Sequence, residues 1–287
     1  MSIASINDLA GTSDVLAQAL QVALPCGYLM AAMLFAMAFA GASEPRVARI
    51  RRPLLRGLLV LHLLLFALHG HQSGGFPRFD LWMSVSSVAL ATALLFVGVT
   101  IRTPQPTVGA MVLLVAGALQ LVSSMFAQMQ VDGVEPAPLA TAVHVITAAF
   151  ASAAVVLSGL YGFLYLLLLR QMKRQTFGAI FQRLPDLTQL ARMTRRSALA
   201  GFGGLALGVN VGFAIAHSTG TSGFHYADPM VLLVLGVWLH FGLIAFSRRI
   251  RGITAQRASW AAVGGLTVLI ATLFLAVVPG ATFHALS

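Results

Sequence analysis

Long apolar runs separated by short polar segments dominate the chain. Eight such runs occur, at about 19–41, 57–70, 81–101, 107–128, 139–169, 197–216, 230–247 and 259–283. A helix needs about 20 apolar residues to cross a ~30 Å hydrocarbon core, so most of these runs predict membrane-spanning helices. The run at 57–70 is shorter, so a helix that starts at an interface is expected there. The pattern predicts an all-α fold, a polytopic transmembrane helical bundle of about eight helices.

Composition points to the same class. Hydrophobic residues make up 58% of the chain and charged residues only 9%, which is typical of a membrane protein rather than a soluble domain. Residues 1–18 contain Asp8 and Asp14 but no Lys or Arg, so they lack the basic start of a cleavable signal peptide. We expect them to form an outer N-terminal tail, followed by a single transmembrane domain over 19–287.

The basic residues fix the expected orientation. Seventeen of the 18 lie in the four segments that follow the first, third, fifth and seventh runs. By the positive-inside rule these segments face the cytoplasm, which places both termini outside. The net charge of +10 is thus explained by topology, so it does not indicate a nucleic-acid partner.

The longest run, 139–169, carries His144 about one turn inside one membrane face. Ala148 and Ala151 share its helix face, so a strip of small residues runs inward from the imidazole. Two interpretations remain open. The small residues let a neighbouring helix approach while His144 hydrogen-bonds across to it, or His144 binds a metal beside a docking surface for a flat macrocycle.

The topology brings seven of the eight histidines toward the outer side and leaves only His240 near mid-membrane, where we expect a packing role. No HExxH or CxxC spacing occurs, and Cys26 is the only cysteine, so thioether attachment of haem is excluded. Arg78 is the only basic residue expected outside. It is either a solvated loop charge or a partner for carboxylates such as haem propionates.

Two further segments have a predicted structural role. Gly204, Gly208 and Gly212 recur at four-residue spacing, which predicts close packing against another helix. The segment 170–196 alternates apolar with basic residues, so we expect it to lie along the membrane surface. Phe224 and Tyr226 are either an aromatic floor for a ligand or ordinary interface aromatics.

Four segments occur in an order that resembles the cytochrome c assembly family of integral membrane haem handlers, the CcsA, ResC and HemX-like proteins. They are GGFPRFDLWMS at 74–84, VHVITAAFASAAVVLSGLYGFLYLLLLRQMKRQ from Val143, FQRLPDLTQLARMTRRSALAGF at 181–202 and HYADPMVLLVLGVWLHF at 225–241. The resemblance implies a multi-pass protein of the bacterial inner membrane that holds or delivers haem at the outer face during cytochrome c biogenesis. It implies a haem handler or synthase subunit rather than a complete enzyme.

The resemblance also implies site residues. His144 and His284 match the outer histidines expected to ligate the iron of a b-type haem, and His62 resembles a histidine of HemX-like members. The family's W-x-W-D-P-K loop corresponds to residues 225–230, which keep Asp228 and Pro229 but neither tryptophan nor the lysine. The remaining implied haem contacts are His225, Arg78, Tyr226, Asp228 and Trp238.

Departures from the family pattern leave a second function open. Phe246 and Gly75 replace two further family histidines. The implied partners are the membrane, a second assembly protein with a large outer domain, and apocytochrome c. The alternative is a HemX-like accessory subunit, or a regulator of haem level, that stabilises a membrane complex without transferring haem.

Overall fold

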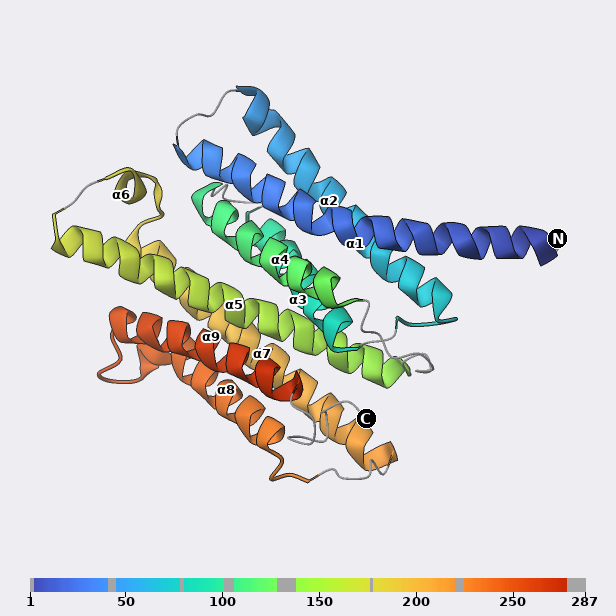
Figure 1. Cartoon of the computed structure of the whole chain (residues 1–287). Coiled ribbons are helices and arrows are strands. Elements are labelled where there is room, and N and C mark those ends of the chain that lie inside the picture. The colour runs from blue at the N-terminus through green and yellow to red at the C-terminus, as the bar shows by residue number, and fades with distance from the viewer. Residues whose placement is uncertain are drawn as a thin grey trace. The chain divides into compact units, whose positions relative to one another are not determined.

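A computed structural model describes residues 3–40, 45–77, 80–100, 106–127, 138–175, 178–219 and 225–277. Within these ranges all regular elements are helices (Figure 1). The chain divides into two compact units, an N-terminal unit, Met1–Ala142, and a C-terminal unit, Val143–Ser287. The single transmembrane domain expected over 19–287 stays a prediction.

Six of the described helices are long and apolar enough to cross a membrane. They comprise Thr12–Met37, Arg49–Gln72, Leu81–Gly98, Thr107–Phe126, Leu139–Lys173 and Leu187–Ser218. An apolar helix at Pro229–Ala245 has 17 residues and falls short of this length. The predicted class, an all-α polytopic bundle, is confirmed, and six spans are identified by length and composition among the described residues. The last predicted run, 259–283, extends beyond these residues, so the number of eight spans stays a prediction. The outward orientation of both termini stays a prediction.

The N-terminal unit contains α1 (Ile3–Ala40), α2 (Pro45–Gln72), α3 (Leu81–Thr100) and α4 (Pro106–Phe126). Helix α1 packs against α2 and α4, and α3 packs against α4. Gly109 on α4 makes room for two aromatic rings, because a Cβ there would clash with both Phe35 and Phe96. These two rings meet edge to face, with centroids 5.9 Å apart.

Two helices of this unit are longer than their apolar runs. Helix α1 already begins at Ile3, so residues 3–18 continue the helix, and Asp14 accepts a hydrogen bond from the Gln72 side chain at 2.7 Å. Helix α2 begins at Pro45, where a missing N–H costs little, and its basic first turns are helical because arginine is a good helix former. These turns were not predicted as helix because the prediction rested on apolar runs, and charged residues lie outside such runs.

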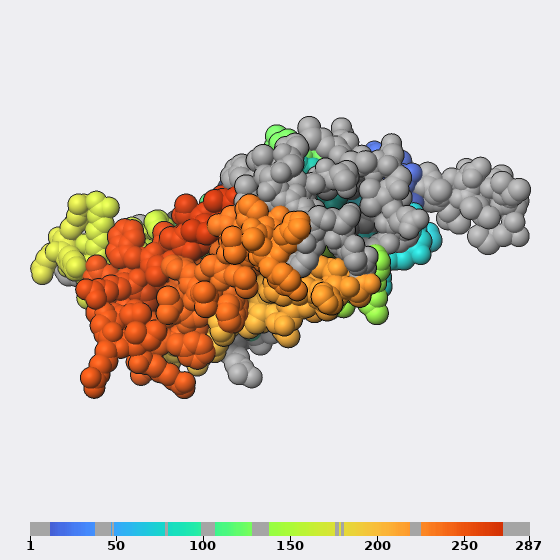
Figure 2. All heavy atoms as spheres, turned by 90° about the horizontal axis from the view of Figure 1, so that it is seen from below, coloured from blue at the N-terminus to red at the C-terminus, as the bar shows by residue number. Residues whose placement is uncertain are grey.

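The C-terminal unit contains α5 from Val143 onward, with the whole helix running Leu139–Lys173. It continues with α6 (Ala179–Arg183), α7 (Leu187–Thr219), α8 (Pro229–Ala245), the 3₁₀ turn η2 (Ser247–Arg249) and α9 (Ala255–Val277). Helix α8 packs between α7 and α9. On the face seen in Figure 2, the atoms of α8 and α9, orange to red, form one continuous surface.

Helix α7 begins ten residues before the apolar run 197–216. The Asp186 carboxylate accepts a hydrogen bond from the backbone N–H of Gln189 at 2.7 Å, and Pro185 precedes it. A carboxylate at this position caps a helix start and favours the positive end of its dipole. The basic segment expected along the membrane surface is therefore mostly helical extension of α5 and α7, and only α6 with its flanks lies between them.

Candidate functional site

His144 on α5 forms a hydrogen bond to the neighbouring helix. Its Nδ1–H donates to the backbone carbonyl of Gly208 on α7 at 2.8 Å. Because a carbonyl oxygen only accepts, the ring proton is on Nδ1 and the lone pair is on Nε2. The ring is half-buried, and Nε2 has no hydrogen-bond partner among the described residues. His144 thus presents one nitrogen that is competent to bind a metal.

Glycines of α7 determine how closely this helix approaches α5. A Cβ at Gly212 would lie 2.8 Å from Cε1 of His144, and a Cβ at Gly204 would lie 2.9 Å from Cβ of Ala151. The strip from His144 to Ala151 is therefore covered by the α7 backbone. The packing interpretation of this strip is the one that the structure shows, and a flat ligand does not dock along it. Only Nε2 of His144 remains for a ligand.

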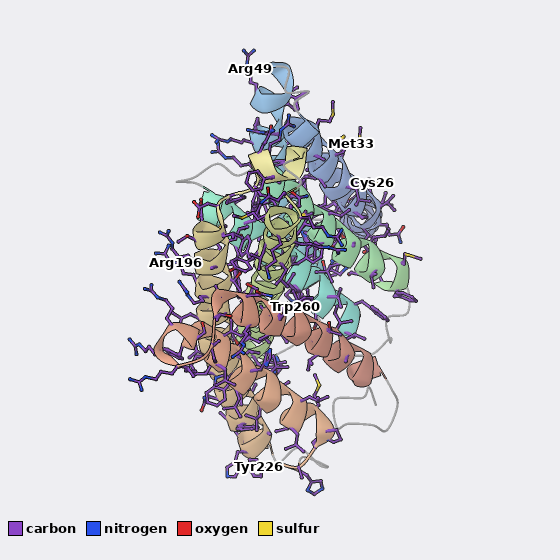
Figure 3. The ribbon with its side chains drawn as sticks, turned by 90° about the vertical axis from the view of Figure 1, so that its left-hand side faces the viewer. Cys26, Met33, Arg49, Arg196, Tyr226 and Trp260 are labelled. Atoms are coloured by element: carbon purple, nitrogen blue, oxygen red, sulfur yellow. The ribbon has the colours of Figure 1, made fainter. Side chains whose placement is uncertain are left out.

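The loop before α8 places two candidate residues near this end of α7. Tyr226 is 63% exposed, and its side chain points away from the helices (Figure 3). Its ring meets Phe213 edge to face, with centroids 5.6 Å apart. Since Phe213 follows Gly212, which contacts His144, the loop and the imidazole belong to the same end of the unit. His225 is exposed beside Tyr226.

Asp228 caps a helix. Its carboxylate accepts a hydrogen bond from the backbone N–H of Met230 at 2.8 Å, and Pro229 occupies the first position of α8. This pair defines the helix start because proline needs no partner for a backbone N–H there. Asp228 is buried. The Asp-Pro pair of the loop thus has a structural explanation that needs no ligand.

Trp238 lies nine residues beyond the start of α8, roughly 14 Å along the helix axis. Its ring stacks on Phe202 of α7, with centroids 4.9 Å apart and planes 13° apart. Its indole N–H is buried and has no partner among the described residues. The structure therefore separates Trp238 from the loop at His225 and Tyr226, with which the resemblance had grouped it.

His62 is fully buried in the N-terminal unit, inside a chain of hydrogen bonds that joins all four helices. Tyr28 donates to Nδ1 at 3.0 Å, and Nε2–H donates to Ser86 at 2.9 Å. Ser86 in turn donates to the Gln120 side-chain oxygen at 2.8 Å, and Gln120 donates to Ser124 at 3.3 Å. Each ring nitrogen already has a partner, so His62 offers no free nitrogen to iron.

We expect His62→Ala to lower the free energy of unfolding by about 2–4 kcal/mol, because it leaves a cavity and removes the partner of two buried hydroxyls. Thermal unfolding followed by circular dichroism measures this. His69→Ala is the control, since Nδ1 of His69 only donates to the Leu65 carbonyl of its own helix. An equal decrease in the free energy of unfolding in the two variants would contradict the proposal that the hydrogen-bond network around His62 stabilises the fold.

His240 forms a second histidine contact between helices. Its Nε2–H donates to the Ala261 carbonyl on α9 at 2.7 Å, and a Cβ at Gly265 would lie 2.8 Å from its Cδ2. The remaining nitrogen, Nδ1, is the one nearer its own backbone. This geometry is that of a packing residue, and it makes His240 a close structural counterpart of His144.

The other candidates are either outside the described residues or exposed. Arg78, Phe224 and His284 lie outside the described residues, while His71 and His217 are exposed. In the described ranges no group of three or more His, Cys, Asp or Glu side chains is arranged to hold a metal ion. A site made from several protein ligands is thus absent from these ranges, whereas a macrocycle that supplies its own nitrogens needs only axial ligands.

Sequence reasoning missed the partners of these histidines. The glycine stripe was assigned to packing, and His144 was a candidate, but nothing in their spacing shows that one bonds the other. One signal was available: the segment around His144 and the segment with the glycine stripe each combine small residues with one polar group. This combination is typical of interfaces between membrane helices. Tyr28, Ser86 and Gln120 gave no signal at all, because each comes from a different helix.

The comparison with protein families covers most of the chain. The family described as "Cytochrome C assembly protein" matches residues 47–281, which include nearly all of α2 and everything through α9. No curated protein matches the chain. The match supports a role in cytochrome c biogenesis, and it agrees with six helices of membrane-spanning length. This chain belongs to the cytochrome c assembly protein family.

Proposed function

We propose that this protein binds haem at the end of the C-terminal unit that holds His144, and that it holds or delivers this haem during cytochrome c biogenesis. The observation that carries the proposal is the bond from Nδ1–H of His144 to the Gly208 carbonyl. Histidines that bind metals usually donate their other ring N–H to a carbonyl or carboxylate, which fixes the tautomer and the ring orientation. His144 has this arrangement.

The residues at this end fit one axial side of a haem. A neutral imidazole with a free Nε2 is a standard ligand of haem iron, which when bound supplies a redox-active metal in a flat apolar ring. Tyr226 and His225 are exposed nearby and offer an aromatic and a polar contact. With Cys26 as the only cysteine the haem is not held by thioethers, so a b-type haem fits best.

We assign the opposite axial position to His284, on the family resemblance alone, and Arg78 to a propionate. His62 is left out because both its nitrogens are occupied. Asp228 and Trp238 shape the helices α7 and α8 rather than touch haem. The partners that we propose are a second assembly protein with a large outer domain and apocytochrome c, in a bacterial inner membrane.

A second function has its own support. The strip beside His144 is filled by α7, and the loop at 225–230 has no tryptophan to cover a macrocycle. These features suit an accessory subunit or a regulator of haem level that performs no transfer. In that case the bond between His144 and Gly208 serves only to join two helices.

Purified protein from cells with ample haem separates the two functions. We expect close to stoichiometric b-type haem by the pyridine haemochrome method, with the sharp visible bands of low-spin, bis-histidine iron. A control preparation of an unrelated polytopic protein from the same cells sets the level of haem carried over by detergent. Haem at that background level would favour the accessory function.

A further inference from the structure

A cavity of about 450 Å³ lies at the basic end of the C-terminal unit, away from His144 along α5 and α7. Its charged lining consists of Arg192, Arg195 and Arg248. Tyr165, Leu187 and Ala191 form much of its apolar lining. We call it the arginine cavity. It plays no part in the haem proposal.

The three arginines of the cavity come from two elements. Arg192 and Arg195 are three residues apart on α7 and so share a helix face, while Arg248 comes from η2. The charges of Arg192 and Arg248 both act on Arg195, which is half-buried. Like charges repel one another, so an anion bound among these arginines would stabilise the arrangement.

The unit supplies little negative charge of its own. Over residues 143–287 the sequence contains only two acidic residues, Asp186 and Asp228. Asp186 caps α7 through Gln189, and Asp228 caps α8 at the opposite end. None of the three arginines of the cavity forms an ion pair with an acidic side chain of the described residues. A bound anion would therefore supply the negative charge that this part of the unit lacks.

Topology alone does not explain this arrangement. The positive-inside rule accounts for basic residues in loops and near helix ends, and it is sufficient for Arg174, Arg196 and Arg251, which are exposed outside the cavity; Figure 3 shows Arg196 on α7. Arg192 and Arg248 are exposed too, but together with the half-buried Arg195 they line a single cavity whose other wall is largely apolar.

We propose that the arginine cavity binds a phosphate-bearing anion. A planar guanidinium can donate two parallel hydrogen bonds to two oxygens of one phosphate group. Three arginines around one cavity can therefore bind a phosphate group through several such hydrogen bonds. The apolar wall and the position at the ends of membrane-length helices favour the headgroup of an anionic phospholipid, whose glycerol and acyl chains can lie along Tyr165 and Leu187. Soluble phosphate compounds share the same chemistry.

The test uses the full chain in detergent and two probes, phosphatidylglycerol and inorganic phosphate, with binding read by native mass spectrometry and calorimetry. The variant R192Q/R195Q/R248Q removes the charged lining. The variant R174Q/R196Q/R251Q removes the same charge from exposed positions outside the cavity. Arg248→Gln alone, on an exposed turn, replaces the first variant if that one is recovered unfolded.

We expect the cavity variant to bind the lipid roughly tenfold more weakly or worse, because charge-assisted hydrogen bonds are lost, while the control variant stays within about twofold of wild type. Loss confined to phosphatidylglycerol identifies a lipid headgroup as the ligand. Loss confined to inorganic phosphate identifies a soluble phosphate compound. Equal weakening in the two triple variants, or no binding of either probe by wild type, would overturn the proposal.

Discussion

A Gly162→Leu variant is expected to lose the packing of α9 on α5 and to give little folded protein. A Cβ at Gly162 would lie 2.8 Å from the Ser259 carbonyl oxygen and 3.4 Å from its Cα. These are backbone atoms, so no side-chain rotation relieves the clash. Gly159, three residues earlier on the same face, is equally confined, with a Cβ position 2.8 Å from Cβ of Leu266. The two helices would have to separate along this contact.

We expect Gly162→Leu to lower the free energy of unfolding by at least about 3 kcal/mol, the upper end of the usual range for an overpacked core. This loss is a large fraction of the stability of most domains. Size-exclusion recovery and thermal unfolding measure it. Gly264→Leu on α9 is the control, because no atom lies within 4 Å of a Cβ at that position. A Gly162→Leu variant that is recovered and melts like wild type would show that α5 and α9 do not pack as described.

The apolar runs predicted helix bounds well where a helix ends at the same place as its apolar run. The runs at 81–101 and 107–128 match α3 and α4 within about two residues, because polar linkers close both helices. They failed at the start of α2 and α7, where the first turns carry basic residues but are helical. The hydropathy of a segment indicates which residues lie in the hydrocarbon core of the membrane. A helix can extend beyond that core, because it continues as long as its backbone hydrogen bonds do.

The sequence predicted which residues of the candidate site share a helix face, but not which helix faces contact each other. Helical spacing shows that Gly204, Gly208 and Gly212 share one face and that Ala148 lies on the face of His144. It does not show that these faces meet, because periodicity identifies a face and not its partner. His62 shows the same limit, since its position on the outer side gave no sign of Tyr28 and Ser86 on other helices.

Replacing His144 should have the largest effect on haem. His144→Ala removes the axial nitrogen and leaves a space beside Gly212 that fits free imidazole, so we expect loss of the low-spin absorbance and partial recovery when imidazole is added. His240→Ala is a matched control, because it also removes one half-buried imidazole and one hydrogen bond to a carbonyl of the neighbouring helix. Both variants therefore lose a similar helix contact.

The central claim, that Nε2 of His144 ligates haem iron, is tested most directly by the visible spectrum and haem content of these two variants beside wild type. We predict that His144→Ala loses the low-spin bands while His240→Ala keeps them at the wild-type level. A full low-spin spectrum in purified His144→Ala, or its loss in His240→Ala alone, would contradict the claim.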